Sequence, residues 1–282
     1  MNELTLGVTL AVLGAGLIHA SWNALLKTAR GGQPMLDTAA VVAGSAVWGF
    51  LALPFVGMPQ PEAWKFIALS SVVHFAYYVA LSNAYRTGDL SFAYPLMRGA
   101  APLITAVFGA VFLRELPSPQ VAFGIVLICA GIVSIAFVQR GRHSRAAVQW
   151  ALANAGIIAA YTLVDSTGAR ASGNALAYVC WLQALEGFPY LAFILWRGRR
   201  DAVVYLARSQ RLAVIGGFAS VAAYGIVLWA MTRAPVAAVA ALRETSVIFA
   251  AIIGAVWLKE GFGMMRLVGA ASVVAGIAAL KL

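Results

Sequence analysis

Charged residues are scarce in this chain, and their scarcity excludes a water-soluble protein. Asp, Glu, Lys and Arg make up 11% of the 282 residues, whereas soluble domains carry about 25%. Hydrophobic residues make up 62% of the chain, and the mean hydropathy is +0.86. Because so few charges cannot cover a surface in water, the chain is predicted to fold in a lipid bilayer.

Cysteine and histidine are also rare. The two cysteines, Cys129 and Cys180, lie in apolar runs without a CxxC motif, so we expect small buried side chains and no disulfide. Three histidines, with His143 in a basic loop, cannot form a His-rich metal site. HExxH, GxSxG and GxxxxGK[ST] motifs are missing from the sequence, which argues against an enzyme and against bound ATP. No cofactor or metal is expected.

Acidic residues are half as numerous as basic ones, and the net charge is +10. The basic residues occur in ones, twos and threes between apolar runs, which is typical of short membrane loops. No basic domain exists, so nucleic acid is not an expected partner. The expected partners are the lipid bilayer and a small-molecule substrate.

Long apolar runs dominate the rest of the chain. A transmembrane helix needs about 20 mostly apolar residues, and period-two alternation, which barrel strands require, is missing. The first run follows Glu3 without a basic residue before it, so we expect a retained span and no cleaved signal peptide. The sequence predicts ten helical spans, at about 4–26, 36–56, 64–85, 90–113, 120–138, 148–168, 175–196, 212–231, 235–258 and 264–280.

The basic residues between these spans predict the orientation. Thirteen Lys and Arg fall on one side of the membrane and five on the other. Basic loops stay cytoplasmic, which predicts an inner-membrane protein with both termini on the non-cytoplasmic side.

An internal repeat divides the chain into two halves, residues 1–140 and 146–282. Residues 87–132 align without gaps with 232–277, and 13 of the 46 positions are identical. Each half has five spans, so the second half enters the membrane from the opposite face. The sequence therefore predicts an all-α integral membrane protein of ten transmembrane helices in two inverted five-helix repeats. Such repeats are typical of alternating-access transporters, which bind substrate near the midplane.

Two matched arginines lie inside the membrane. Arg98 and Arg243 each lie eight residues into their spans from opposite faces, about 12 Å deep at 1.5 Å per residue. They are predicted either to receive a substrate carboxylate or phosphate or to satisfy buried structural groups. Glu244 is not expected to pair with its neighbour Arg243, since adjacent helix residues face apart. It is expected to line the cavity or to pair with another helix.

Further polar residues are candidates for the same cavity. Glu186, in the middle of span 7, is predicted to be a counter-ion of one arginine or a proton-coupling carboxylate. Asp165 is expected near headgroups and water at the outer end of span 6. His74 and Tyr78 belong to a polar aromatic face of span 3, with helix packing as the alternative, and Tyr94 is a further candidate in span 4.

Span 1 adds a polar patch, and span 4 adds two prolines. His19, Trp22 and Asn23 are substrate-binding candidates, although a histidine such as His19 often serves only packing. Trp181 is a weaker candidate. The two prolines, Pro95 and Pro102, are predicted hinges. Glu115 and Glu260 are expected to fix helix ends. Small residues allow a close approach of helices, and four glycines are expected to serve close packing or a homodimer contact, namely Gly124, Gly131, Gly269 and Gly276.

The chain resembles the EamA-domain branch of the drug/metabolite transporter superfamily. The likeness is in HASWNALLK (19–27), AYRTGDLSFAYPLMRGAAP (84–102) and the repeat endings at 112–131 and 257–276. It implies a basket of ten helices around a central cavity, lined mainly by helices 1, 3, 4, 6, 8 and 9, with helices 5 and 10 peripheral or at a dimer contact. Span 9 departs from span 4, because AVAALRETS has no proline.

These observations favour a secondary transporter that exports small carboxylate-bearing metabolites such as amino acids. Alternatives are a flippase or carrier of phosphorylated or lipid-linked metabolites on the same fold, a receptor or structural subunit, and an integral membrane enzyme. The paired arginines and the inverted repeat distinguish the transporter, because a structural protein has no need for them.

Overall fold

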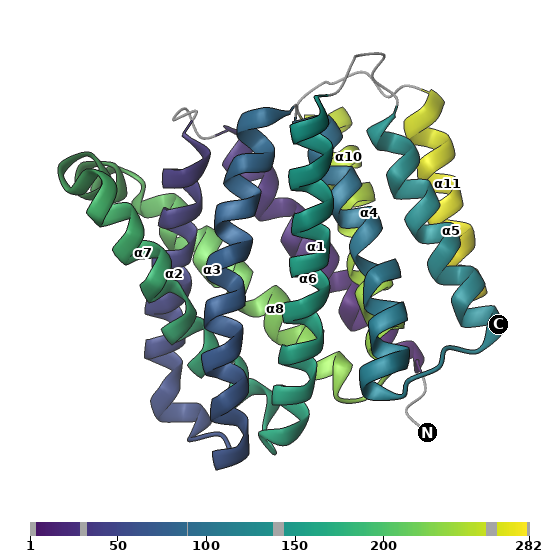
Figure 1. Cartoon of the computed structure of the whole chain (residues 1–282), viewed down its shortest axis with the longest axis horizontal. Helices are drawn as coiled ribbons and strands as arrows, with labels where there is room; N and C mark the ends of the chain where they lie inside the picture. Colours follow the sequence, from purple (N-terminus) through teal and green to yellow (C-terminus); the bar gives the residue numbers. More distant parts are fainter. Residues whose placement is uncertain (1–3, 29–32, 89, 138–143, 258–263, 281–282) are drawn as a thin grey trace.

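The computed structural model is a bundle of helices standing side by side (Figure 1). It describes residues 4–28, 33–88, 90–137, 144–257 and 264–280, apart from the side chains of 22–28, 34, 90–91, 251, 254–257 and 264–267. The helices are α1 (Leu6–Thr28), α2 (Pro34–Val56), α3 (Trp64–Thr87), α4 (Leu90–Phe108), α5 (Pro119–Ala136), α6 (Arg145–Ala171), α7 (Ala175–Arg208), α8 (Gly217–Met231), α9 (Val236–Arg243), α10 (Ser246–Trp257) and α11 (Met264–Ala279). Short turns are η1 (Pro61–Ala63) and two π-helical turns, η2 (Gly109–Leu113) and η3 (Leu212–Gly216).

The outer surface of the bundle is apolar. Phe55 is 88% exposed, Leu116 83% and Phe112 71%, a surface that lipid covers and water does not. Within the described residues, seven helical stretches are long and apolar enough to cross a membrane, and α1 and α11 contain shorter apolar stretches. The all-helical class is confirmed, and ten spans stay a prediction.

The two halves of the chain pack mainly on each other. Three helices of the first half pack on helices of the second half: α1 packs on α8 and α10, α2 packs on α7 and α8, and α3 packs on α6 and α7. Helix α4 contacts α5 and α6. A surface between the halves therefore runs through the middle of the bundle, where polar residues of both halves can meet.

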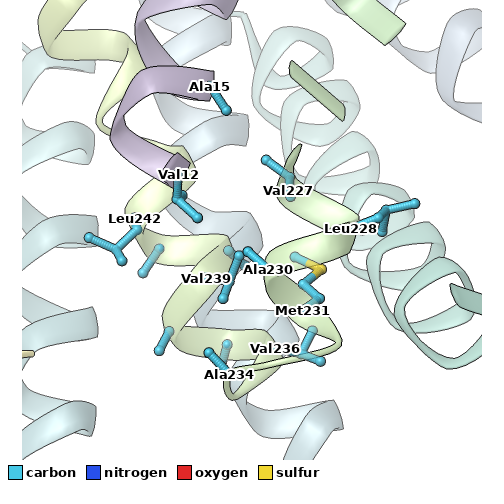
Figure 2. Packing of buried hydrophobic residues seen from close by; sticks show 14 of the residues in the cluster. Val12, Ala15, Val227, Leu228, Ala230, Met231, Ala234, Val236, Val239 and Leu242 are labelled. Atoms are coloured by element: carbon cyan, nitrogen blue, oxygen red, sulfur yellow. The ribbon is translucent and has the colours of Figure 1, made fainter. Parts of the chain in front are cut away.

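Helix α9 lies at the centre of the larger core. All of its residues, from Val236 to Arg243, are buried, and Figure 2 shows Val239 and Leu242 packed among side chains of α1 and α8. Four alanines among its eight residues keep this helix thin, which lets neighbouring backbones approach closely.

Span 9 is interrupted, and span 4 is not. Helix α9 ends at Arg243 and α10 begins at Ser246. The N–H of Thr245 donates to the Leu242 carbonyl (3.1 Å), and its hydroxyl donates to the same carbonyl (2.7 Å). Such side-chain bonds compete with helix continuation.

The two predicted hinge prolines lie inside a single helix. Helix α4 runs continuously through Pro95 and Pro102. The interruption therefore lies in the half that lacks these prolines, and a hinge at Pro95 or Pro102 stays a prediction.

Glycines join α5 to α11. A Cβ at Gly124 would lie 2.9 Å from the Gly276 carbonyl oxygen, and one at Gly131 would lie 2.7 Å from that of Gly269. The first glycine of one helix faces the second of the other, so the two helices pack antiparallel with their backbones in contact. The glycine face is thus used for close packing within the chain, which was one of the two expectations, and a homodimer contact stays a prediction.

Glu115 fixes a helix end, as predicted. Its carboxylate lies 2.5 Å from Arg170 Nη1 and accepts a hydrogen bond from the N–H of Val236 (2.9 Å), the first residue of α9. The matching Glu260 lies outside the described residues. Cys129 and Cys180 are buried free thiols, as expected.

Because backbone lies in contact at Gly131, we expect Gly131→Ala to lower the free energy of unfolding by about 1–3 kcal/mol. Thermal unfolding in detergent measures the effect. The matched control is Gly156→Ala, where an added Cβ meets nothing within 4 Å. Equal stability of the two variants would contradict the backbone contact between α5 and α11.

Candidate functional site

A cavity of about 170 Å³ lined by charged, aromatic and apolar side chains lies at the centre of the bundle. Eight helices contribute side chains to it, four from each half: α1, α2, α3 and α4, and α6, α7, α8 and α9. The resemblance implied six of these, and α2 and α7 are added by the structure. Of the predicted site residues, it is lined by His19, His74, Tyr78, Tyr94, Arg98, Glu186 and Arg243.

Two arginines and one glutamate form an ion triad at this cavity. Arg98 Nε lies 2.5 Å from Glu244 Oε2, and Arg243 Nη2 lies 3.1 Å from Glu244 Oε1. Arg98 also donates to the Ser246 hydroxyl (3.5 Å). The repeat thus places its matched arginines on one carboxylate, between α4 and the interruption of span 9.

The prediction that Glu244 would not pair with Arg243 is wrong. Arg243 is the last residue of α9, and Glu244 already belongs to the interruption, so the helical rule for adjacent residues does not apply. Glu244 is 0% exposed and is not among the residues lining the cavity. It therefore holds the arginines in place from behind the cavity wall.

The triad carries one excess positive charge. Among the described residues, two guanidinium groups share the single carboxylate of Glu244. A buried charge is costly unless a partner compensates it. The cavity side of the triad therefore suits a small anion.

Glu186 lies elsewhere in the cavity. Its Oε2 lies 3.3 Å from His74 Nδ1, and its Oε1 accepts a hydrogen bond from the Tyr78 hydroxyl (3.4 Å). His74 Nδ1 also lies 3.0 Å from the Ser70 hydroxyl. The prediction that Glu186 is the counter-ion of an arginine is wrong, since Glu244 pairs with both arginines and Glu186 contacts His74 and Tyr78 of α3.

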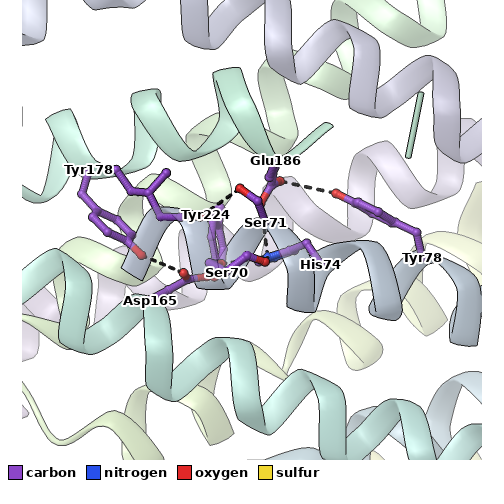
Figure 3. Close-up of polar contacts among 9 residues, drawn as sticks. Ser70, Ser71, His74, Tyr78, Asp165, Tyr178, Glu186 and Tyr224 are labelled. Carbon is purple, nitrogen blue, oxygen red and sulfur yellow. Dashed lines mark hydrogen bonds and ion pairs between the residues drawn. The ribbon is translucent and has the colours of Figure 1, made fainter. Parts of the chain in front are cut away.

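Asp165 is deeply buried, contrary to its expected place near headgroups. Its carboxylate accepts hydrogen bonds from the hydroxyls of Tyr178 (2.9 Å) and Tyr224. Figure 3 shows Ser70 beside Asp165 and His74 beside Glu186, so α3 lies between the two acids. Helices α7 and α8 cover Asp165 with tyrosines, and for that reason its carboxylate is shielded from solvent.

Aromatic rings form the wall between the ionic groups. His74 stacks on Tyr161, with ring centroids 4.4 Å apart, and Tyr77 and Tyr224 make edge contacts with Tyr161. Arg98 lies over the Tyr94 ring, 5.8 Å from its centroid. The His/Tyr face predicted for span 3 therefore lines the cavity.

The remaining predicted residues have different places. Trp181 donates to the Gly57 carbonyl (2.9 Å) and packs on Trp64, so it lies at one end of the bundle and not in the cavity. That prediction is wrong because Trp181 faces a helix connection. The side chains of Trp22 and Asn23 lie outside the described residues.

A second cavity of about 600 Å³ lies between α2, α3 and α7. Arg86, Arg197 and Asp201 are among its lining residues. Tyr85 lines both this second cavity, called the outer cavity, and the central one. Its side chain therefore lies between the central site and the charged residues of the outer cavity.

Sequence analysis missed several lining residues. Tyr224 gave no signal of its own, because tyrosines in apolar helices usually serve packing, whereas Tyr161 lies opposite His19 when the repeat is shifted by 142 residues. Tyr77 lies three residues after His74 and could have been found from the helical spacing in span 3. Helix α2 contributes Ser45, Thr38 and two valines, which nothing in the sequence distinguishes from ordinary membrane residues.

The chain is thus a membrane bundle with a cavity that charged residues from both halves line. The EamA-like transporter family matches residues 5–137 and 145–282, and the chain belongs to this family. It is thus a multi-pass membrane protein of a transporter family, not an enzyme family.

The comparison with solved structures supports the same fold. A crystal structure of another protein superposes with a TM-score of 0.76 at 19% sequence identity, covering 100% of this chain and 99% of the other. At that identity the likeness shows the fold alone. No curated protein sequence gives a significant match to the chain.

Removing the shared carboxylate leaves two buried guanidinium groups facing each other. We therefore expect Glu244→Gln to lower the free energy of unfolding by about 3 kcal/mol, measured by thermal unfolding in detergent. The control is Glu62→Gln, at an exposed turn, with an expected change within about 0.5 kcal/mol. Unfolding temperatures that agree between the two variants would refute the positioning role of Glu244.

Proposed function

We propose that this protein is a secondary transporter that exports a small carboxylate-bearing metabolite across the inner membrane by alternating access. Amino acids are the substrate class that we favour. One observation carries the proposal. Arg98 and Arg243, at matching positions of the two halves, meet on Glu244 and line one cavity with an excess positive charge. Guanidinium groups bind carboxylates through paired hydrogen bonds.

An amino group has a counterpart in the same cavity. Glu186 and His74 line it together with the arginines. A solute with a carboxylate at one end and an ammonium group at the other would meet opposite charges at both. The tyrosines between these groups suit an apolar or aromatic side chain.

Ten spans in two inverted repeats, residues 1–140 and 146–282, belong to the proposal. The antiparallel contact of α5 with α11 supports it, because Gly124 and Gly131 match Gly269 and Gly276 in the repeat and pair crosswise. A two-fold axis in the membrane plane relates helices in this way.

Alternating access needs helices that bend near the cavity. Glu244 of the triad lies in the interruption of span 9, and Arg98 lies between Pro95 and Pro102 of α4. Opening to one side would then move α10, or one end of α4, against a fixed charge centre.

The size of the cavity favours a small solute over a lipid. About 170 Å³ enclosed by eight helices has no room for two acyl chains. Arginine binds phosphate groups as well as carboxylates, so phosphorylated metabolites are alternative substrates. The transport assay distinguishes them from amino acids.

The function is tested by counterflow into proteoliposomes, which needs no coupling ion. With vesicles loaded with unlabelled amino acids, we expect entry of a labelled amino acid and no entry of its carboxamide, which lacks the anionic end. Arg98→Ala should abolish entry, and Arg98→Lys should raise the KM about 10- to 100-fold, because the paired hydrogen bonds are lost.

Arg233→Ala is the matched control, since Arg233 is exposed at one end of the bundle over Trp229. Full activity of folded Arg98→Ala protein would refute the role of the arginines. Entry of sugar phosphates in place of amino acids would reassign the substrate to phosphorylated metabolites.

The orientation is tested by cysteine labelling. Arg86 and Lys65 are exposed at opposite ends of α3, and the native Cys129 and Cys180 are buried. We expect Arg86→Cys to react with an impermeant maleimide only from the cytoplasmic side and Lys65→Cys only from the other side. The reverse labelling pattern would invert the proposed topology.

A further inference from the structure

The last part of α7 is too long to belong to the transmembrane span. The helix has 34 residues, about 51 Å at 1.5 Å per residue, whereas the hydrocarbon core is about 30 Å thick. Ala175 to Arg197 already gives about 34 Å. Residues 199–208 must therefore lie outside the core or along its surface.

A change of direction separates this part from the span. Gly198 has non-helical backbone angles (φ −165°, ψ 65°) within α7. In Figure 1 the end of α7 lies at the edge of the bundle, beyond α2. The helix thus turns where the hydrocarbon core ends.

The turned segment is held firmly against the bundle. Ala202 is buried in a cluster with Met35 and Leu36 of α2, and Leu206 packs on the same cluster. The Tyr205 hydroxyl donates a hydrogen bond to the Asp37 carboxylate. One face of the segment is therefore fixed, and the other face is presented outward.

The outward face combines positive charge with apolar side chains. Between residues 196 and 211 there are five arginines and one acid, Asp201. All five arginines are exposed, namely Arg197, Arg199, Arg200, Arg208 and Arg211, and together they are called the arginine surface. Trp196 (83% exposed), Val203 (51%) and Val204 (42%) lie among them.

We propose that the arginine surface binds the headgroups of anionic phospholipids at the membrane surface. Exposed Val and Trp side chains need an apolar neighbour, which acyl chains supply at the depth where a membrane helix ends. Exposed guanidinium groups at the same level meet lipid phosphates, with which they form charge-assisted hydrogen bonds. An acidic soluble protein would match the charge and leave the apolar side chains without a partner.

Lipid binding of this kind fixes the position of the turned segment. Because Tyr205 donates a hydrogen bond to Asp37, lipid binding also fixes the start of α2. The outer cavity lies beside it, and Arg197 belongs to both. Anionic lipid would thus hold one rim of that cavity in place. This binding does not depend on which solute the transporter carries.

The test is lipid retention by the full chain, measured by native mass spectrometry from detergent micelles containing equal amounts of phosphatidylglycerol and phosphatidylcholine. We expect wild-type protein to retain phosphatidylglycerol preferentially. In Arg199→Gln/Arg200→Gln/Arg208→Gln the preference should fall about tenfold or more, since each arginine near an anionic surface contributes about 1 kcal/mol. Raising the salt from about 0.1 to 1 M should weaken the wild-type preference as the screening length falls to about 3 Å.

The matched control is Lys65→Gln/Arg114→Gln/Arg233→Gln, which removes three exposed positive charges outside the arginine surface. It should keep the wild-type preference. The proposal is overturned if wild-type protein retains both lipids equally, or if both triple variants lose the preference alike. The salt dependence of wild-type protein gives an answer even where a variant does not fold.

Discussion

The ion triad of Arg98, Glu244 and Arg243 is the interaction on which the rest of the site depends. A guanidinium group in the middle of a membrane costs several kcal/mol unless it is paired or hydrated. Here one carboxylate, 2.5 Å and 3.1 Å from the two arginines, reduces that cost for both. The same arrangement keeps the two halves of the chain together, because each half contributes one arginine. It also leaves one positive charge facing the cavity.

Several features of the fold follow from this constraint. Helix α9 is rich in alanine and wholly buried, so the arginine that ends it reaches the centre of the bundle. The interruption after Arg243 turns Glu244 back toward its neighbour, which a continuous helix would not permit. Elsewhere in the bundle, two tyrosines donate hydrogen bonds to the carboxylate of Asp165, and Glu186 contacts His74 and Tyr78. Glu244 is thus the partner of the arginines, and Glu186 has partners of its own in α3.

The histidines and charged residues that line the cavity were predicted from the sequence, and some of them were assigned wrong partners. Arg98, Arg243, His74, Tyr78 and Glu186 were predicted from charge, spacing and the repeat, and all line the cavity. The partners of Glu186 and Glu244 were not predictable. They depend on where span 9 is interrupted and on which face of α7 meets α3, and both are set by packing between segments far apart in the chain. Trp181 was misplaced for the same reason, because only the fold decides which helix connection it meets.

The sequence by itself determined the solvent, the secondary structure and the repeat. A chain with 11% charged and 62% hydrophobic residues folds in lipid and not in water. In lipid the backbone N–H and C=O groups must form their hydrogen bonds with each other, which helices achieve. The tertiary structure alone decided which side chains share the cavity, that the glycines of α5 join α11 within one chain, and that the end of α7 turns outward at Gly198. The physical reason is that hydropathy acts on each segment separately, whereas these contacts depend on the relative rotation and depth of helices that only close packing fixes.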